Sequence, residues 1–327
     1  MTQKSDNGIM VSVVMISYNR AAYIGKAIES VVNQKVDFKF ELIITDDCST
    51  DGTYEIACEW AERYPGIVKV FRNSTNLGIQ ANYVEAFKHC TGRYLAMCDC
   101  DDYWCSRKKL ATQVAYMENH PECSLTFHRV VNSYENDHSK SLSNGGLRNP
   151  VTLETLSRGN VITNLSVMYR RGLVDLTKLP EWVLDIQLID YSIHMFYASR
   201  GEIHYFSKPM GVYRLWNDGT WGGSDRYGRL MMSYKVRRYL MEHFKDNTRI
   251  LPGLVEASRN ILLQMMKSTS NDDERGYAQS ELIRIRAFEN EESIQAALDK
   301  LRETKPPMLK RVLKQLRKMI SRLVPLP

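Results

Sequence analysis

The sequence is organised around the stretch Asp99-Cys100-Asp101-Asp102-Tyr103-Trp104, which directly follows the apolar run Tyr94-Leu95-Ala96-Met97-Cys98. The apolar run is typical of a buried strand, and three carboxylates follow it within four positions. Because like charges this close repel, one carboxylate would take up a proton unless a cation held the group. Hard oxygen ligands at a strand end suit Mg²⁺ or Mn²⁺, which keep open positions for phosphates. The alternative is an acidic turn that only begins the next helix, with Asp102 or Ser106 as its N-cap.

Strand-like and helix-like segments alternate with short connections before this stretch. Residues 10–17 form a largely β-branched run, which predicts a strand buried on both faces. The alternation favours an α/β fold with a doubly wound, mostly parallel sheet and helices on both faces. The predicted strands are 10–17, 40–45, 68–71 and 94–98, and the predicted helices are 22–33, a segment that Thr50 or Asp51 caps and that ends near 63, and 78–90.

Polar side chains collect after three of these strands, where parallel sheets bind their ligands. They are Tyr18, Asn19 and Arg20 after the first strand, Asp46 and Asp47 after the second, and the acidic stretch after the fourth. Asp47 can accept a hydrogen bond from a base or a ribose, and Tyr18 can stack on a base, although each alone is also compatible with an ordinary loop. The first loop has no glycine-rich phosphate motif, so a metal at the acidic stretch becomes more necessary. Together these groups predict a nucleotide site.

The chain beyond the acidic stretch gives weaker signals. Residues 216–223 are aromatic and glycine-rich, the composition of a lid or a sugar platform, although a packed turn has the same composition. Asp190 and His194 lie one turn apart on a predicted helix, so their side chains can meet. The predicted helices are 106–119, 184–200, 224–245, 251–267, 271–290 and 292–304, the predicted strands are 124–131, 161–169, 203–206 and 211–215, and 133–150 is predicted to be a loop.

Length and composition restrict the class of protein. The 327 residues suffice for one large α/β domain and an appendage. The net charge of +6 is concentrated in the last residues, so a nucleic-acid surface is not indicated. Seven irregularly spaced cysteines favour reduced thiols in the cytosol. The polar N-terminus has no signal peptide, and no apolar run reaches the roughly 18 residues that span a bilayer.

The C-terminal tail is a separate feature. Residues 308–323 carry apolar side chains at helical spacing, with Lys or Arg at most of the other positions. This pattern predicts a basic amphipathic helix that lies on an anionic membrane surface, at the inner face. The alternative is a terminal helix that docks its apolar stripe on the same protein.

Several segments of the first 120 residues match known motifs, and together they resemble the family-2 glycosyltransferases, which have the GT-A fold. The opening strand and its Ser-Tyr-Asn-Arg turn match, and Cys48 replaces a glycine in the family's D-D-G-S-T-D element. The acidic stretch is a D-D-Y-W variant of the family's D-x-D-D cluster. The matching segments are 11–20, 27–34, 41–51, Asn76-Leu77-Gly78 with Asn82, and 92–104.

The second half matches more loosely. Asp190-Tyr191 and residues 201–205 resemble the segment that carries the family's catalytic base. Val212-Tyr213-Arg214 and Gly219-Thr220-Trp221 resemble its closing loop, in which the family's His falls on Trp216. A metal would then be held by Asp101, with Asp99 as a further ligand, and by the diphosphate and water.

The resemblance implies transfer of a sugar, with inversion, from a nucleoside diphosphate to an acceptor hydroxyl. The metal would be Mn²⁺ or Mg²⁺, and the donor is expected to be a UDP-sugar. The acceptor is expected to be a glycan or a lipid-linked sugar of a bacterial surface polysaccharide. The implied catalytic base is Asp190, with Asp185 as the fallback, the metal ligands are Asp101 and Asp99, and the donor-binding residues are Ser17, Tyr18, Arg20, Asp46, Asp47, Asn76, Asp99, Asp102, Arg214 and Trp221.

The chain is expected to divide into a glycosyltransferase domain, a helical extension and the tail. The domain covers 1–223, with a nucleotide-sugar half at 1–120 and an acceptor half at 121–223, and 224–304 and 305–327 follow. One rival function is a sugar nucleotidylyltransferase, which would need a Gly- and Arg-rich phosphate loop after the first strand. The other is a non-catalytic nucleotide-sugar sensor at the membrane, a reading that the missing His keeps open.

Overall fold

The computed structural model of the chain describes residues 8–134, 138–215 and 224–288. Some predictions therefore lie outside the described residues. They are Trp216 and Trp221 of the closing loop, the helix at 292–304 and the tail helix at 308–323.

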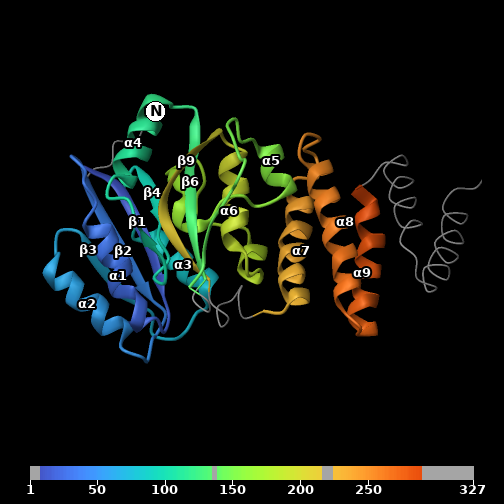
Figure 1. The fold of residues 1–327 in the computed structure, drawn as a ribbon, viewed down its shortest axis with the longest axis horizontal. Coiled ribbons are helices and arrows are strands. Elements are labelled where there is room, and N and C mark those ends of the chain that lie inside the picture. Colours follow the sequence, from blue (N-terminus) through green and yellow to red (C-terminus); the bar gives the residue numbers. More distant parts are fainter. Residues whose placement is uncertain (1–7, 135–137, 216–223, 289–327) are drawn as a thin grey trace, which may run out of the picture.

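The centre of the described structure is one nine-stranded sheet (Figure 1). Its strands are β1 (Ile9–Ser17), β2 (Lys39–Asp46), β3 (Val68–Arg72), β4 (Tyr94–Met97), β5 (Tyr103–Trp104), β6 (Cys123–Tyr134), β7 (Lys140–Leu142), β8 (Met168–Arg170) and β9 (Glu202–Leu215). They lie in the order β3-β2-β1-β4-β8-β6-β9-β5, and β7 pairs with the edge of β6. The first four in this order are parallel, and β8 then runs antiparallel to both β4 and β6.

The predicted double-sided burial of the first strand is confirmed. Val11, Val13 and Met15 pack into one hydrophobic cluster, whereas Val14 packs into the cluster on the opposite face. The first cluster includes α1 (Ala21–Val32), α2 (Thr53–Arg63) and α4 (Lys109–Asn119), and the second includes α3 (Ile79–Lys88). Because a sheet covered on both faces excludes water, its loops at the strand ends are where polar chemistry can be placed.

Three segments differ from the prediction near the acidic stretch. Tyr103 and Trp104 form β5, which pairs antiparallel with Val212 and Gly211 of β9. The helix predicted from 106 begins only at Lys109, and its N-cap is Lys108, so neither Asp102 nor Ser106 caps it. The N-cap of α2 is Gly52 in the left-handed conformation, not Thr50 or Asp51. The first difference comes from pairing with a distant strand, and at the two helices the local capping preference of Asp, Ser and Thr is not followed.

The second half also departs from the prediction. The two strands predicted at 203–206 and 211–215 are one long strand, β9, with an irregular register opposite His128 to Val130. The predicted loop at 133–150 contains the short strand β7. The segment at 161–169 contains a 3₁₀ turn (Asn164–Ser166) before β8, and the helix predicted at 184–200 is a 3₁₀ turn, η2 (Glu181–Asp185), followed by α6 (Ile189–Ala198).

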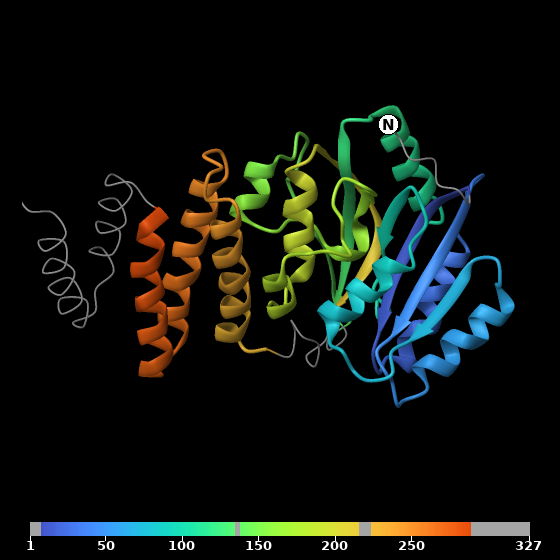
Figure 2. The same ribbon diagram turned by 180° about the vertical axis from the view of Figure 1, so that it is seen from behind.

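The helical extension packs directly on the sheet domain (Figures 1 and 2). It consists of α7 (Arg226–His243), α8 (Leu251–Ser268), α9 (Asp272–Arg284) and a 3₁₀ turn (Ile285–Phe288). Side chains of α7 and α8 belong to the same hydrophobic cluster as α3 and α6, and α8 also packs on α5 (Leu153–Arg158). None of the described helices is both long and apolar enough to cross a membrane.

Gly92 sets the distance between the start of β4 and β1. A Cβ atom at this position would lie 2.4 Å from the backbone nitrogen of Ser12 and 2.7 Å from the carbonyl carbon of Val11. Because these neighbours are backbone atoms of a buried strand, Gly92→Ala is predicted to lower the free energy of unfolding by about 2 kcal/mol or more. Urea denaturation measures this change. Gly66→Ala, where nothing lies within 4 Å of the added Cβ, is the control and should change stability by less than about 0.5 kcal/mol. Equal stability of the two variants would contradict the packing described for β4.

Candidate functional site

The carboxyl ends of β1, β2 and β4 meet at one edge of the sheet. Ser17 pairs with Asp46 across β1 and β2, and Val14 pairs with Met97 across β1 and β4. The chain therefore leaves these three strands in the same direction, and their polar turns lie side by side. The turns carry two distinct groups of acids, one around Asp46 and Asp47 and one around the acidic stretch.

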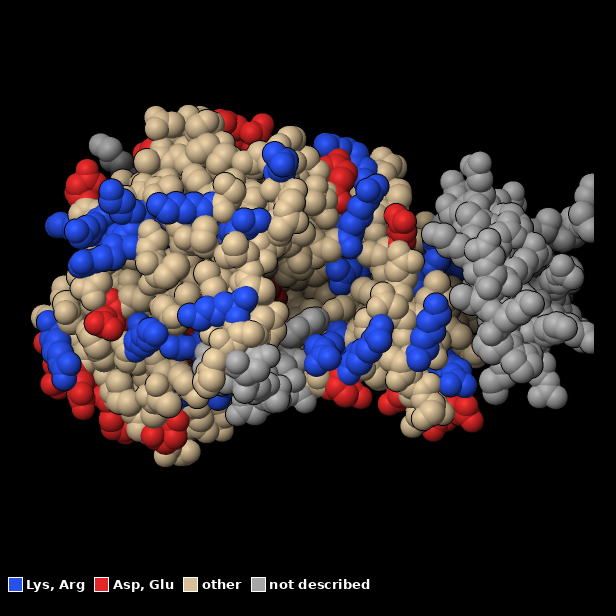
Figure 3. Space-filling model, viewed as in Figure 1, with Lys and Arg blue, Asp and Glu red and all other residues tan. Residues whose placement is uncertain are grey.

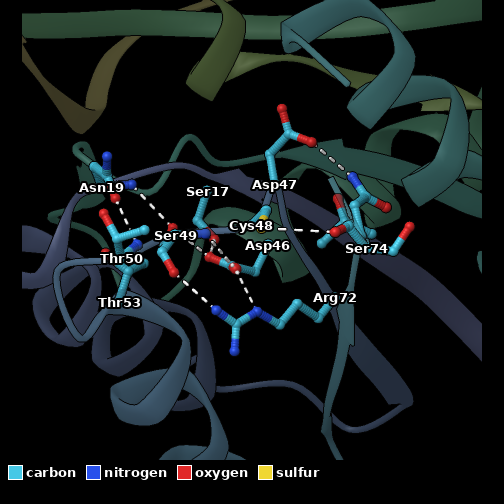
Figure 4. Close-up of polar contacts among 12 residues, drawn as sticks. Ser17, Asn19, Asp46, Asp47, Cys48, Ser49, Thr50, Thr53, Arg72 and Ser74 are labelled. Atoms are coloured by element: carbon cyan, nitrogen blue, oxygen red, sulfur yellow. Dashed lines mark hydrogen bonds and ion pairs between the residues drawn. The ribbon is translucent and has the colours of Figure 1, made fainter. Parts of the chain in front are cut away.

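Asp46 is fully buried and accepts hydrogen bonds only from protein groups (Figure 4). Its Oδ1 accepts from the hydroxyls of Ser17 at 3.2 Å and Ser49 at 2.5 Å, and its Oδ2 accepts from the backbone N–H of Ser49 at 2.9 Å. The guanidinium of Arg72 lies 3.6 Å from Oδ2. Asp46 and Ser17 thus hold the turn after β2 in place, and Asp46 exposes no surface to a ligand.

Asp47 holds the loop after β3 in a similar way. Its Oδ1 accepts from the N–H of Leu77 at 2.8 Å and from Nδ2 of Asn73 at 2.9 Å, and its Oδ2 accepts from the N–H of Gly78 at 2.9 Å. Asn76 also accepts from the N–H of Gly78, at 3.0 Å. An ionised carboxylate has about four acceptor positions, so Asp47 retains capacity for a further donor.

Two neighbours complete this part of the edge. Tyr18 is 46% exposed, so its ring is accessible for stacking. Cys48 has a left-handed backbone with φ of 64°, the conformation that a glycine adopts without strain. The glycine-to-cysteine difference noted in the sequence therefore falls on a position whose geometry favours glycine.

Asp99 contacts α3 and the segment before β8. Its Oδ1 accepts from the hydroxyl of Tyr83, and Nδ2 of Asn164 lies 3.0 Å from both carboxylate oxygens. Burial, together with the charges of Asp101 and Asp190, raises the pKa of Asp99 to about 6, although these hydrogen bonds oppose the rise. The crowding that the sequence predicted is therefore present.

Asp101 and Asp102 have different surroundings. The carboxylate of Asp101 is 27% exposed, and its Oδ2 accepts from Nε of Arg20 at 3.3 Å. Asp102 is buried, and its Oδ1 accepts from the backbone N–H of Arg214 at 2.8 Å, which joins the acidic turn to the end of β9. Burial and the charges of Asp101 and Asp99 hold the pKa of Asp102 well above its usual range. The guanidinium of Arg214 also donates to the backbone carbonyl of Asp101 at 2.7 Å.

Asp190 reaches the same region from the first turn of α6. Its Oδ2 accepts from Nδ2 of Asn160 at 3.3 Å, and burial raises its pKa. Burial raises the pKa of Tyr213 on β9, and the charges of four of these acids raise it further. Those four are Asp102, Asp99, Asp101 and Asp190. The fallback base Asp185 lies on η2 instead, where it is exposed and its backbone carbonyl accepts from Lys235.

Three residues of this site were missed by the sequence prediction. Tyr83 was assigned to the helix at 78–90, and Asn160 and Asn164 stand next to or inside a segment assigned to a strand. The only signal in the sequence was the presence of two asparagines, four residues apart, around an otherwise apolar run. Asn160 also changes the predicted contact of Asp190 with His194, because both side chains bond to Asn160 instead.

The donor atoms at this site fit a hard divalent cation. In the described part of the chain, no group of three or more His, Cys, Asp or Glu is placed to hold a metal. Asp101 and Asp99 can supply carboxylate oxygens, and Mg²⁺ and Mn²⁺ sites of this kind are completed by substrate phosphates and water. Cys98 and Cys100 are poor ligands because burial holds the pKa of each thiol well above its usual range.

Lys and Arg side chains border a hollow in the molecular face between the sheet and α7 (Figure 3).

Comparison with known proteins adds independent findings. The family model described as Glycosyl transferase family 2 matches residues 12–175. An uncharacterized protein of Mycobacterium tuberculosis is 37% identical over 213 residues, which cover 64% of this chain and 60% of that protein. The putative teichuronic acid biosynthesis glycosyltransferase TuaG of Bacillus subtilis is 36% identical over 118 residues, which cover 36% of this chain and 45% of that protein. The chain thus spans about 60% of the length of the mycobacterial relative.

Two solved structures share the fold. The mannosyltransferase PcManGT from Pyrobaculum calidifontis, in complex with GDP-Man and Mn²⁺, has a TM-score of 0.59 and 18% identity, over 97% of this chain and 81% of that one. Residues 1–349 of TarS from S. aureus, in complex with UDP, have a TM-score of 0.60 and 17% identity, over 94% of this chain and 87% of that one. At this identity the likeness concerns the fold alone.

Asp46→Asn is predicted to be destabilising, because the buried carboxylate accepts three hydrogen bonds and faces Arg72. Loss of one charged acceptor in a buried network should lower the free energy of unfolding by about 2 kcal/mol, measured by urea denaturation. The matched control is Asp175→Asn on the surface, which should change stability by less than about 0.5 kcal/mol. If Asp46→Asn is as stable as the wild type, Asp46 does not hold the turn.

Proposed function

Because the chain belongs to glycosyl transferase family 2 and has the GT-A fold, we propose that it transfers a sugar from a nucleoside diphosphate to an acceptor hydroxyl, with inversion at the anomeric carbon. The observation that supports this most is the convergence of Asp99, Asp101 and Asp190 from β4 and α6 on one region. Each acid has different partners there, so each can have a different role.

The nucleoside binds at the ends of β1 and β2. Tyr18 stacks on the base, and Asp47 accepts a base or ribose hydrogen with the acceptor capacity that its loop contacts leave. The contribution to nucleoside binding is indirect for three residues, which hold the binding loops in place: Asp46, Ser17 and Asn76. The donor is a UDP-sugar, with a hexosyl or N-acetylhexosaminyl group. The TarS complex with UDP and the PcManGT complex with GDP-Man support a nucleotide-sugar donor.

The sugar and diphosphate lie over the acidic stretch. Asp99 contacts the ribose and sugar end of the donor. Asp102 positions Asp101 and Arg214, because it accepts a hydrogen bond from the backbone of Arg214 at the end of β9. Arg20 and Arg214 lie on either side of Asp101 and can neutralise the diphosphate, with Trp221 closing over the donor. Asp101, together with Asp99, would hold a Mn²⁺ or Mg²⁺ ion, which stabilises the charge of the leaving diphosphate when bound.

Asp190 is the general base. It takes the proton of the acceptor hydroxyl while the acceptor oxygen bonds to the anomeric carbon and the bond to the diphosphate breaks. The nucleoside diphosphate leaves with the bonding electrons. Burial raises the pKa of Asp190 toward the operating pH, and a base is most effective when its pKa lies near that pH.

The acceptor is a glycan or lipid-linked sugar of a bacterial surface polysaccharide, a proposal that the teichuronic acid function in the name of the TuaG relative supports. The protein works in the cytosol, and all of its seven cysteines are free in the structure, which fits a reducing compartment. The basic tail at 305–327 attaches it to the anionic inner face of the membrane.

Donor binding and turnover separate the proposed enzyme from a nucleotide-sugar sensor. UDP-GlcNAc, UDP-glucose and GDP-mannose are tested with Mn²⁺ by thermal shift, since a ligand of the folded state raises the melting temperature, and by release of the nucleoside diphosphate. Asp101→Ala is predicted to lose the Mn²⁺-dependent shift. Asp190→Asn should keep the shift and lose turnover by about 10²-fold or more.

The control for these variants is Asp175→Asn, which should behave as the wild type. If the wild type binds a nucleotide sugar but never releases the nucleoside diphosphate, the protein is a nucleotide-sugar sensor and not a transferase. Release of pyrophosphate from a nucleoside triphosphate and a sugar phosphate would indicate the nucleotidylyltransferase instead.

Deletion of residues 308–327 is predicted to abolish sedimentation of the protein with vesicles that contain phosphatidylglycerol. Electrostatic attraction contributes about 1 kcal/mol per cation near such a surface, so wild-type binding should fall as salt rises and should be weak on phosphatidylcholine alone. Leu313→Ser with Leu316→Ser keeps the charge and removes part of the apolar stripe, and should bind at an intermediate level. Unchanged partitioning of the deletion variant would refute the membrane role of the tail.

A further inference from the structure

Asn160 lies between Asp190 and His194 and contacts both. Its Nδ2 is 3.3 Å from Oδ2 of Asp190, and its Oδ1 is 3.3 Å from Nδ1 of His194. The backbone N–H of Ile162 also donates to Oδ1, at 3.1 Å. Asn160 is exposed, whereas the ring of His194 is fully buried in α6. The amide therefore stands at the open side of the proposed base.

The hydrogen-bond partners fix the orientation of this amide. A backbone N–H can only donate, so the Asn160 atom that faces Ile162 must be the oxygen. The NH₂ group must then face Asp190, to which it donates. Nδ1 of His194 must carry the hydrogen that Oδ1 accepts. Burial lowers the pKa of His194 to about 3, so the ring is neutral at physiological pH and can hold this tautomer.

We infer that Asn160 is a positioning residue for the base, and that His194 and Ile162 hold it in that role. The inference deepens the proposed function and depends on Asp190 being the general base. A donor to the ionised carboxylate opposes the effect of burial and keeps Asp190 able to accept a proton. It also engages Oδ2 from one side, which leaves the remaining acceptor positions for the acceptor hydroxyl.

Other titratable groups face Asp190 and must be separated from this effect. They are Asp99 after β4, Tyr83 of α3, Tyr169 of β8 and Tyr213 of β9. From the neighbouring helix α7, the cation of Arg237 lies over the ring of Tyr191, 4.9 Å from its centre. Since Asp99 has a pKa of about 6, it titrates in the physiological range, and a test must compare variants that all retain it.

The first test measures stability against pH without substrate or divalent ions. The wild type, Asn160→Leu, Asp190→Asn and the double variant are melted between pH 4 and pH 8. Burial raises the pKa of Asp190, so the stability that the protonated carboxyl contributes is lost as pH rises through that pKa. Loss of the Asn160 donor raises the pKa of Asp190 further. The stability lost through Asn160→Leu should therefore increase with pH. When Asp190→Asn is already present, the stability lost through Asn160→Leu should not depend on pH.

If Asn160→Leu lowers stability by the same amount at every pH, both in the wild type and in Asp190→Asn, the inference is overturned. The second test measures hydrolysis of UDP-GlcNAc with Mn²⁺. Asn160→Leu should lower kcat about tenfold at pH 7 and leave KM unchanged, with the acidic limb of the rate profile about 0.5–1 pH unit higher. His194→Phe, which frees the amide to rotate, should shift the limb in the same direction by less.

The control is Asn119→Leu, an exposed asparagine on α4 that bonds only the carbonyl of Ala115, and its profile should match the wild type. Full activity of Asp190→Asn would overturn the proposed base, and the role of Asn160 with it. An inactive Asp190→Asn together with an unchanged acidic limb in Asn160→Leu would overturn only the role of Asn160.

Discussion

The placing of four carboxylates close together is the constraint on which this site depends. Asp99, Asp101, Asp102 and Asp190 all act on Tyr213, and the charges of neighbouring acids add to the effect of burial in raising the pKa of Asp99 and of Asp102. The protein opposes this effect with donors from every surrounding element. Tyr83 and Asn164 bond Asp99, Arg20 bonds Asp101, Arg214 bonds Asp102, and Asn160 bonds Asp190. Such a site is ready for a cation and for a polyanionic donor that brings one.

The two groups of acids at the strand ends have different physical roles. Asp46 and Asp47 both accept hydrogen bonds that shape the loops at the ends of β2 and β3, and Asp47 keeps acceptor capacity beyond them. Asp99, Asp102 and Asp190 of the converging group keep raised pKa values despite their partners, with burial as the largest cause. Perturbed pKa values of this kind are typical of functional sites, whereas the turns held by Asp46 and Asp47 are fixed by hydrogen bonds within the protein.

The first half of the fold could be predicted from the sequence because its signals are local. The apolar run of β1, the alternation with α1 and α3, and the acidic turn after β4 all follow from periodicity. The prediction failed where contacts distant in sequence decide the structure. Tyr103 and Trp104 become a strand only because β9 pairs with them. Asn160 and Asn164 acquire their roles only when α6 and β4 approach them, and no local pattern records that approach.

The central claim is that these carboxylates form one electrostatic unit that a metal and a nucleotide complete. NMR titration of the protein with ¹³C-carboxyl-labelled aspartate, alone and with Mg²⁺ and UDP, tests it most directly, with Asp99→Asn to assign the resonance. The account predicts that Asp99 titrates near pH 6 in the free protein and that its pKa falls by about one unit or more when Mg²⁺ and UDP bind. A carboxylate of Asp99 that titrates near its ordinary value of about 4 and does not respond to Mg²⁺ and UDP would contradict it.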